Sequence, residues 1–254
     1  MSSPIAHRQR ASIPQEGRLI QQRYHVLRCL GRGNMGAVYE ALDLTTNSPR
    51  ALKVLHPEVV SDDDLRARFI REAQVTGPIQ SDHIVRVLDA GIDAETGSPF
   101  LVMELLNGED IESMIVRVKR VSCEETALFL MQVSLALDKV HTAGIVHRDI
   151  KPANLFVTHR DDGSVCIKVL DFGVAKVLSS SASARATMVA GTLLYMAPEQ
   201  LTGASDLGPH TDIYAMGQVA YTMLTGEPYW RGEVNSSGGF MEVFQRIANG
   251  SSEP

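Results

Sequence analysis

The sequence predicts an α+β fold in which a small antiparallel β-sheet precedes a mostly helical second half. Short apolar segments separated by turn residues occupy residues 24–55, as expected for a meander of strands. A helix start followed by an apolar stripe marks residues 122–144, and residues 212–224 form a second apolar helix before Gly226 and Pro228. We therefore expect strands to dominate the first half and helices the second.

Strand patterns account for most of the first half. Residues 24–30, 37–39 and 51–55 are rich in apolar and β-branched side chains, and residues 47–49 (NSP) predict a turn between the last two strands. Residues 1–22 are polar and show no period, so we expect a flexible leader there.

One helix interrupts these strands. It is expected to begin at Ser61, whose side chain can cap the helix, and three aspartates at 62–64 favour its first turn. Gly77-Pro78 would end it. Residues 84–88 (IVRVL) and 100–103 (FLVM) then predict two further strands.

The second half begins with a strong helix signal. Ser122 and Glu125 have the spacing of a capping box, and Gly144 fits the end of the helix that they open. Residues 155–157 and 165–170 predict short strands on either side of an Asp-Asp-Gly turn. No internal repeat is visible in the sequence.

The length suits one large domain or two small lobes that share a cleft. The chain has 254 residues, of which 44% are hydrophobic and 21% charged, an ordinary globular composition. From the element patterns we expect a leader over residues 1–22, a first lobe over residues 23–106 and a second lobe over residues 107–254.

Charge and cysteine content narrow the class of protein. The net charge of −6 argues against a nucleic-acid surface, which needs a clustered basic face. No apolar run is long enough for a membrane helix, and the N-terminus lacks the apolar core of a secretory signal. Cys29, Cys123 and Cys166 are odd in number and far apart, which predicts reduced thiols and a cytoplasmic location.

Residues 30–38 (LGRGNMGAV) match the pattern G-x-G-x-x-G-x-V. Alone this pattern is weak, because Gly31, Gly33 and Gly36 could simply satisfy turn geometry. A dinucleotide-binding fold would need a helix to open at the third glycine. Since the residues after Gly36 look like a strand, the pattern favours a strand-glycine-strand hairpin whose backbone N–H groups cover nucleotide phosphates.

Lys53 lies in a predicted strand and shares a face with Ala51 by strand alternation. A small residue beside a purine and a cation beside phosphates would be a sensible pairing. Glu72, in the following predicted helix, could hold the lysine as an ion pair. The alternative for either residue alone is an ordinary solvated side chain.

Residues 145–155 (IVHRDIKPANL) carry the strongest chemistry in the chain. A carboxylate at Asp149 can orient an attacking hydroxyl and accept its proton. Lys151 can offset charge on a transferring phosphoryl group, and Asn154 offers a neutral oxygen to a hard cation. This run resembles the protein kinase catalytic loop, H-R-D-x-x-x-x-N, at every fixed position.

Further kinase motifs follow in the expected order. Residues 171–173 (DFG) would place Asp171 on a metal ion that bridges ATP phosphates, and residues 197–199 (APE) follow later. The resemblance covers about residues 24–230. It implies a bilobal kinase fold, with a small antiparallel β-rich N-lobe that carries one helix and a larger helical C-lobe. It also implies ATP and Mg²⁺ (or Mn²⁺) as cofactors, and proteins as substrates.

The resemblance extends to the kinase class and to the nucleotide pocket. Lys151 and Thr192 resemble the residues that Ser/Thr kinases carry at these positions. The sequence of the catalytic loop resembles that of bacterial kinases of the eukaryotic type. Met103 would be the gatekeeper, and the backbone of Glu104 and Leu106 would bind adenine. The remaining implied pocket residues are Asp110 at the ribose, and the apolar Leu30, Val38, Ala51 and Phe156, which could equally be ordinary core residues.

Residues 174–195 would form the activation segment. Thr187 is the best candidate for autophosphorylation there, and Arg148 could bind the added phosphate. The alternative is a merely flexible loop of small residues. Asp212 resembles the buried acid that supports the backbone of the catalytic loop.

The sequence departs from the family pattern at its end. Kinase C-lobes normally continue through further helices, one of which carries an arginine that pairs with the APE glutamate, here Glu199. The chain ends at Pro254 without them. We therefore expect missing C-terminal helices, an unpaired Glu199, exposed apolar surface and reduced stability.

Two other functions stay open at this point. The missing helices would suit a truncated, non-catalytic ATP-binding scaffold, whereas the intact Lys53, Asp149, Asn154 and Asp171 argue against it. A small-molecule kinase is disfavoured by residues 191–192 and 197–199, which resemble a protein-substrate platform. No sequence feature supports a homodimer.

Overall fold

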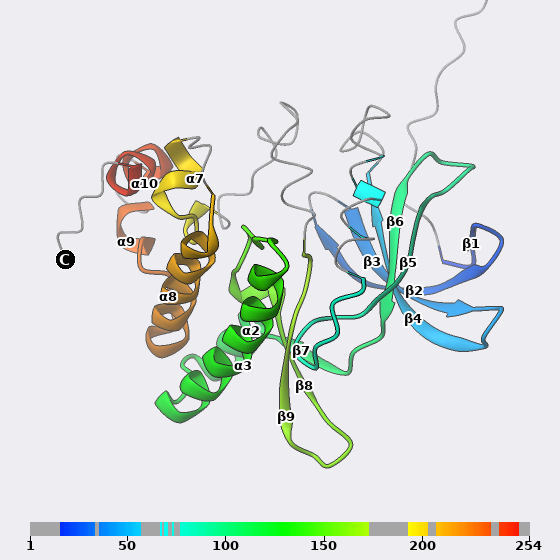
Figure 1. Ribbon diagram of the computed structural model, residues 1–254, viewed down its shortest axis with the longest axis horizontal. Coiled ribbons are helices and arrows are strands. Elements are labelled where there is room, and N and C mark those ends of the chain that lie inside the picture. Colours follow the sequence, from blue (N-terminus) through cyan, green and yellow to red (C-terminus); the bar gives the residue numbers. More distant parts are fainter. Residues whose placement is uncertain are drawn as a thin grey trace, which may run out of the picture. The chain divides into compact units, whose positions relative to one another are not determined.

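The computed structural model describes residues 16–33, 36–56, 67, 69–70, 73, 77–172, 193–202, 207–234 and 239–248 (Figure 1). The chain forms two compact units. The first comprises Met1–Ile70 and Val87–Leu105, and the second comprises Arg71–Arg86 and Leu106–Pro254.

Residues 71–86 thus cluster with the second unit, although the sequence pattern placed them in the first lobe. The reason is a backbone contact with strand β9 (Val165–Val169). The Val85 amide donates to the Val169 carbonyl, and the Val169 amide donates to the His83 carbonyl. Ile84 forms only an isolated bridge to Val169, so the strand predicted at 84–88 begins three residues later, at Val87.

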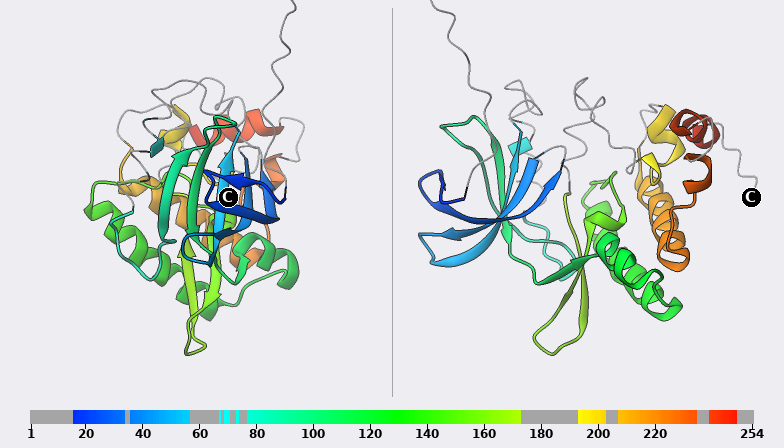
Figure 2. Two further views of the ribbon diagram at one scale, coloured as in Figure 1. Left: turned by 90° about the vertical axis from the view of Figure 1, so that its right-hand side faces the viewer. Right: turned by 180° about the vertical axis from the view of Figure 1, so that it is seen from behind.

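The first unit is built on a six-stranded antiparallel sheet of order β1-β2-β3-β4-β6-β5 (Figure 2). The strands are β1 (Leu19–Ile20), β2 (Tyr24–Gly33), β3 (Gly36–Asp43), β4 (Ser48–Leu55), β5 (Val87–Ile92) and β6 (Pro99–Glu104). The meander predicted over residues 24–55 is confirmed.

Strand β1 lies inside the segment predicted to be a leader. Its Ile20 is completely buried and pairs with Tyr24, and this burial explains why the chain is ordered there. One face of the sheet forms an apolar cluster, which includes Ile20, Tyr24, Val26, Tyr39, Leu52, Val54, Phe100 and Val102.

The second unit contains a three-stranded antiparallel sheet and several helices. The strands are β7 (Gly108–Asp110), β8 (Leu155–His159) and β9, in the order β7-β8-β9. The helices are α2 (Ile111–Val118), α3 (Cys123–Thr142), the 3₁₀ turn η2 (Pro152–Asn154), α7 (Pro198–Thr202), α8 (Pro209–Thr225), α9 (Arg231–Val234) and α10 (Gly239–Ala248).

Several predicted local signals appear in this unit. Ser122 and Glu125 form the predicted capping box at the start of α3. Gly226 ends α8 in the left-handed conformation, and Gly163 has a φ of +81° in the turn between β8 and β9. The helix predicted to begin at Ser61 falls mostly outside the described residues.

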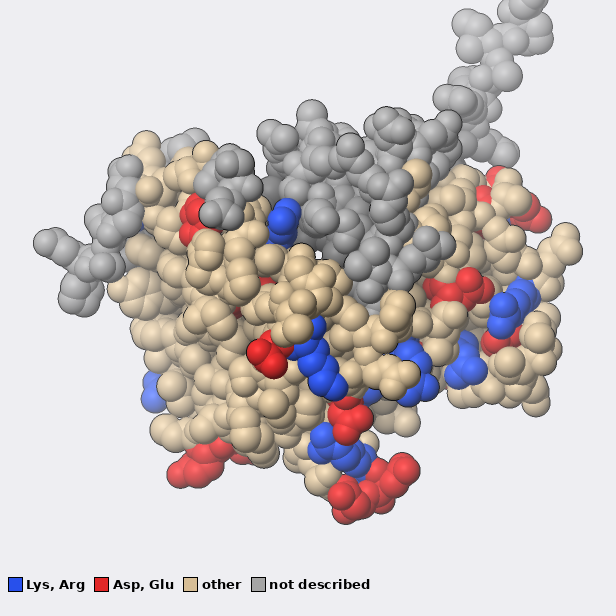
Figure 3. All heavy atoms as spheres, in the orientation of Figure 1, with Lys and Arg blue, Asp and Glu red and all other residues tan. Residues whose placement is uncertain are grey.

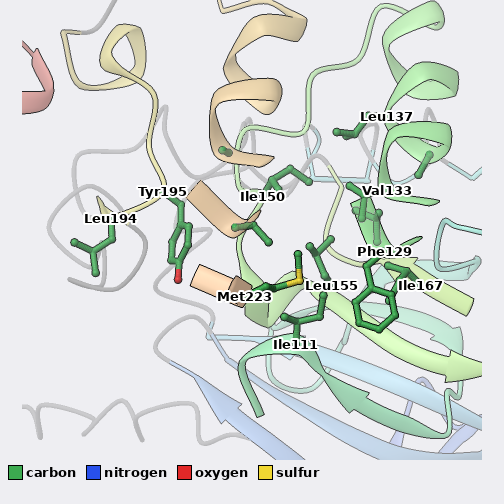
Figure 4. Packing of buried hydrophobic residues seen from close by; sticks show 14 of the residues in the cluster. Ile111, Phe129, Val133, Leu137, Ile150, Leu155, Ile167, Leu194, Tyr195 and Met223 are labelled. Atoms are coloured by element: carbon green, nitrogen blue, oxygen red, sulfur yellow. The ribbon is translucent and has the colours of Figure 1, made fainter. Parts of the chain in front are cut away.

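The core of the second unit joins α3, α8 and the β8–β9 hairpin (Figure 4). Ile150 and Leu155, on either side of η2, pack in this cluster with Ile111 and Met223. Buried apolar side chains therefore anchor the chain directly after Asp149 and again directly after Asn154. On α8, the large apolar side chains of Ile213, Tyr221 and Leu224 are exposed.

Acidic and basic side chains are interspersed on the face drawn in Figure 3. Among the described helices, none is long and apolar enough to cross a membrane.

Candidate active site

In the first unit, the residues predicted around the nucleotide share one face of the sheet. Val38 pairs directly with Lys53, and Ala51 pairs directly with Met103. Since Ala51 and Lys53 are two residues apart on β4, all four side chains lie on the same face. Leu52, between them, points to the opposite face and is fully buried. The prediction that Ala51 and Lys53 share one face of their strand is confirmed.

The glycine motif forms a hairpin between β2 and β3. Gly31 pairs with Val38, and Gly33 pairs with Gly36, where β3 begins. This is the predicted strand-glycine-strand arrangement, and no helix opens at Gly36 as a dinucleotide-binding loop would require. Leu30 lies at an irregularity in the strand register and is exposed.

In the second unit, the catalytic-loop residues converge on Asp149. The Lys151 ammonium donates to both carboxylate oxygens, at 3.0 and 2.9 Å. Asn154 Nδ2 donates to the Asp149 carbonyl oxygen at 2.7 Å and to Asp149 Oδ2 at 2.9 Å. The carboxylate is about one-fifth exposed, so it is held in one orientation and still reaches solvent. It can therefore accept a proton from a hydroxyl placed against it.

The backbone before Asp149 is held by Asp212. This acid is completely buried near the start of α8. Its Oδ2 accepts from the His147 amide at 2.9 Å, and its Oδ1 accepts from the Arg148 amide at 2.8 Å. The supporting role implied by the resemblance matches this geometry.

Two histidines near this acid were not singled out from the sequence. His141, in the last turn of α3, places Nε2 2.7 Å from Asp212 Oδ2. His147 is fully buried, and its Nε2 donates to the Leu170 carbonyl at 2.8 Å while its Nδ1 accepts from the Asp149 amide. The signal for His147 was its place in the H-R-D motif. No sequence signal pointed to the contact of His141.

The residues predicted to bind a metal are connected through the backbone. The Leu170 amide donates to the Asn154 carbonyl at 2.9 Å, so Asp171 follows directly from that contact. The Asn154 amide nitrogen is committed to Asp149, which leaves its Oδ1 as the atom offered to a cation. One carboxylate and one amide oxygen suit Mg²⁺, which takes few protein ligands beside substrate phosphates. The described residues contain no cluster of three or more His, Cys, Asp or Glu side chains that could hold a metal.

Backbone strain marks both sides of the site. Arg148 has a φ of +68° and Asp171 a φ of +62°, although neither residue is glycine. Such conformations cost of order 1–3 kcal/mol and persist only where surrounding contacts impose them. Next to Asp171, the buried Phe172 packs edge-on against the His147 ring at 4.5 Å between centroids.

The structure places the other predicted nucleotide-binding residues within one unit or the other. Asp110 caps α2, because its carboxylate accepts from the amide and hydroxyl of Ser113 at 2.8 and 2.9 Å. Phe156 pairs with Asp110 across β7 and β8. Glu104 ends β6, and Leu106 begins the last segment of the second unit. Their roles toward a nucleotide stay predictions.

The expectation that Glu199 would be unpaired was wrong. Its Oε1 accepts from the Thr211 hydroxyl at 2.7 Å and lies 3.4 Å from His210 Nε2. The first turn of α8 supplies both groups, a contact that the sequence spacing did not reveal. The predicted residues Glu72, Thr187 and Thr192, as well as Gly173 of the DFG motif, lie outside the described residues.

Comparison with known proteins decides the family. The protein kinase domain family matches residues 24–252. The chain belongs to the protein kinase family. Among similar proteins, this kinase domain is 36% identical over 223 residues to the Ser/Thr-protein kinase PknA of Mycobacterium tuberculosis, covering 87% of the chain and 51% of PknA. It is 38% identical to the Ser/Thr-protein kinase pkn3 of Myxococcus xanthus, covering 83% of the chain and 39% of pkn3.

Solved structures agree. The crystal structure of the Mycobacterium tuberculosis PknI kinase domain matches with a TM-score of 0.68 and 31% identity, covering 85% of this chain and 79% of that one. The predicted kinase fold and the resemblance to bacterial Ser/Thr kinases are confirmed. The kinase domain spans about half the length of PknA and less of pkn3.

Proposed function

We propose that this kinase domain transfers the γ-phosphate of ATP to Ser and Thr hydroxyls of proteins, with Asp149 as the base. The observation that carries the proposal is the Asp149 carboxylate, which Lys151 and Asn154 hold from two sides. A carboxylate oriented in this way can accept the proton of an attacking hydroxyl as the phosphoryl group leaves ADP.

Positioning and electrostatics supply the remaining catalysis in this proposal. Lys151, besides orienting Asp149, offsets negative charge on the transferring phosphoryl group. The reaction is a direct in-line transfer without a covalent enzyme intermediate. Thr192 is assigned beside Asp149 and Lys151 by the resemblance alone.

Protein kinases use ATP with a divalent metal ion, and we assign Mg²⁺ (or Mn²⁺) to Asn154 and Asp171. The oxygen donor set and the backbone link between Asn154 and Leu170 support this assignment. The bound metal would neutralise charge on the β- and γ-phosphates. Comparing phosphotransfer with Mg²⁺ and with Mn²⁺ distinguishes the two ions.

The first unit is proposed to hold the nucleotide. Lys53, supported by Glu72, would bind the α- and β-phosphates, and the backbone of Gly31, Gly33 and Gly36 would cover them. The shared sheet face of Val38, Ala51, Lys53 and Met103 supports this role. The adenosine would be bound by Leu30, Val38, Ala51, Met103, Glu104, Leu106, Asp110 and Phe156.

Phosphorylation of the activation segment is proposed at Thr187, with Arg148 as the phosphate ligand. In support, the Arg148 Nε is buried without a hydrogen-bond partner among the described residues. A phosphate would supply an acceptor for it. Mass spectrometry of residues 174–195 after incubation with ATP would locate the site, and a phosphate elsewhere in the segment would remove the assignment to Thr187.

The decisive test compares the unaltered chain with Asp149→Asn. We expect phosphotransfer to a generic protein substrate to fall by about 10²–10⁴-fold. ATP binding, followed by fluorescence of a nucleotide analogue, should stay within about twofold because Asp149 does not hold the nucleotide. Asp138→Asn, an exposed change on α3, serves as the matched control.

Two outcomes would reject the proposal. An unchanged rate in Asp149→Asn would remove Asp149 as the base. An unaltered chain that binds ATP but labels neither itself nor a substrate would favour the non-catalytic scaffold. Protein substrates follow from the family, whereas the cytoplasmic location and the absence of a nucleic-acid partner stay predictions.

A further inference from the structure

We propose that Gln200 is a positioning residue, whose side-chain amide fastens the segment that carries the APE motif to the backbone immediately before Asp149. Gln200 follows Glu199 directly and lies half-buried in α7. The inference rests on the proposed function, because it concerns the orientation of the proposed base. Two separate hydrogen bonds, one from each end of the amide, support it.

The oxygen end of the amide caps α7. Gln200 Oε1 accepts from the Ala197 amide at 3.0 Å. Pro198 is the first residue of the helix, so Gln200 is the third, from which Gln or Glu side chains commonly reach back to the capping residue. This arm alone would make Gln200 an ordinary helix cap.

The nitrogen end of the amide makes a second hydrogen bond, which a helix cap does not require. Gln200 Nε2 donates to the Arg148 carbonyl at 2.8 Å, across 52 residues of sequence. That carbonyl belongs to the peptide bond that joins Arg148 to Asp149. The contact therefore acts on the backbone from which the proposed base extends.

Arg148 is also the residue that needs such support. It has a φ of +68°, a conformation that must be imposed by contacts. On one side, Asp212 Oδ1 accepts from its amide at 2.8 Å. On the other side, Gln200 binds its carbonyl. Both peptide groups that flank the strained residue are thus held, one from α8 and one from α7.

The residue type agrees with a role at both ends. A glutamate at position 200 could cap α7 equally well, since its carboxylate also accepts a hydrogen bond. It could not donate to a carbonyl when ionised. The partners also assign the orientation of the amide, because the Ala197 N–H requires the oxygen and the Arg148 carbonyl requires the nitrogen.

The consequence is a coupling between two motifs. Ala197 is completely buried, and Leu194, Tyr195 and Met196 before it are buried as well, so this segment cannot shift independently of its surroundings. A displacement of Ala197 or of α7 would reach the Arg148–Asp149 peptide through Gln200. The proposed base and the APE segment should therefore become ordered together.

Two variants separate the arms. Gln200→Met keeps the length of the side chain and loses both hydrogen bonds, whereas Gln200→Glu keeps the acceptor and loses the donor. We expect kcat for a protein substrate to fall about tenfold in each, because both variants lose the hydrogen bond that positions the Arg148–Asp149 peptide, and about one hydrogen bond corresponds to about a tenfold change in rate. The KM for ATP should stay within about twofold. Gln245→Glu, an exposed change of the same chemistry on α10, should leave both constants unchanged.

Amide hydrogen exchange provides a readout that does not depend on activity. Gln200→Glu should accelerate exchange in peptides covering residues 145–150 but leave the Ala197 amide protected. Gln200→Met should accelerate exchange in both regions. If Gln200→Met does not fold, Gln200→Glu decides alone, because it retains the cap of α7.

The proposal is overturned if Gln200→Glu changes neither kcat nor exchange near Arg148. It is equally overturned if only the exchange at Ala197 responds in Gln200→Met, since Gln200 would then be a helix cap and no more. A lack of phosphotransfer by the unaltered chain would instead reject the proposed function. The exchange measurements would still test whether Gln200 holds the Arg148–Asp149 peptide.

Discussion

The buried carboxylate of Asp212 accepts a hydrogen bond from the backbone amide of Arg148 at 2.8 Å, across 64 residues of sequence. The same carboxylate binds the His147 amide and lies 2.7 Å from His141 Nε2. One acid on α8 therefore organises the backbone that leads into Asp149, which makes it a natural site for testing how the catalytic loop is held.

Substituting this acid should weaken the fold and the site together. Asp212→Asn can present only one oxygen to the two amides, so its NH₂ group would face the other donor. We expect a loss of about 2–3 kcal/mol in the free energy of unfolding, from one broken charge-assisted hydrogen bond. Urea unfolding measures the loss, and Asp138→Asn, exposed on α3, is the control. An unchanged urea midpoint would show that the hydrogen bonds of Asp212 do not contribute to the free energy of unfolding.

The three glycines of the hairpin should respond differently to alanine. A Cβ on Gly36 would lie 2.0 Å from the Val54 carbonyl oxygen, whereas a Cβ on Gly31 or Gly33 would meet no atom within 4 Å. Gly36→Ala should therefore destabilise the first unit by more than about 2 kcal/mol. Gly31→Ala and Gly33→Ala should leave stability unchanged and raise the KM for ATP, because under the proposed function the missing side chain lets the backbone approach the nucleotide. Equal stability losses at all three positions would contradict this division.

Acid should weaken the first unit through Asp43. The hydrogen bonds from Arg23, at 2.9 and 2.8 Å, lower the pKa of the Asp43 carboxyl below its ordinary value. A lowered folded-state pKa adds stability that is fully present above the unfolded pKa of about 4 and is lost as the pH falls below it. Asp43→Asn should cost about 2 kcal/mol at pH 7, and its difference from the unaltered chain should shrink below pH 4.

Thermal unfolding followed from pH 7 to pH 3 checks this prediction. Asp161→Asn, exposed in the turn between β8 and β9, should change stability by less than about 0.5 kcal/mol at every pH. A constant difference between Asp43→Asn and the unaltered chain across the whole range would exclude the ion pair as the source of the stability.

The pairing of Glu199 can be tested from its partner. Thr211 is almost completely buried, and its hydroxyl donates to Glu199 Oε1. Thr211→Val keeps the shape of the side chain but removes the donor, so stability should fall by about 1.5 kcal/mol. Thr202→Val, exposed in α7, should be close to neutral. A neutral Thr211→Val would mean that Glu199 needs no support at this site.

Segments whose structure depends on interactions between residues close in sequence could be predicted from the sequence. The capping box of Ser122 and Glu125, the meander over residues 24–55 and the glycine hairpin each depend on neighbours a few positions apart. The catalytic loop was recognisable for the same reason, since Asp149, Lys151 and Asn154 lie within six consecutive residues and meet there. Strand alternation likewise placed Ala51 and Lys53 on one face.

The remaining features depend on contacts between distant segments. Three contacts join residues that are far apart in sequence and follow no periodic pattern: the Asp212–Arg148 and Gln200–Arg148 hydrogen bonds and the hydrogen bond from Thr211 to Glu199. The bridge between Ile84 and Val169, which precedes the start of β5 at Val87, is a contact of the same kind. Local propensity and motif spacing act over a few residues, whereas a buried carboxylate or carbonyl takes whichever donor the packed chain brings to it. The sequence by itself thus determined which residues we propose to carry the chemistry and, by resemblance, that Asp212 supports them. Only the tertiary structure decided the contacts of Gln200, His141 and Glu199, because these depend on how distant segments pack.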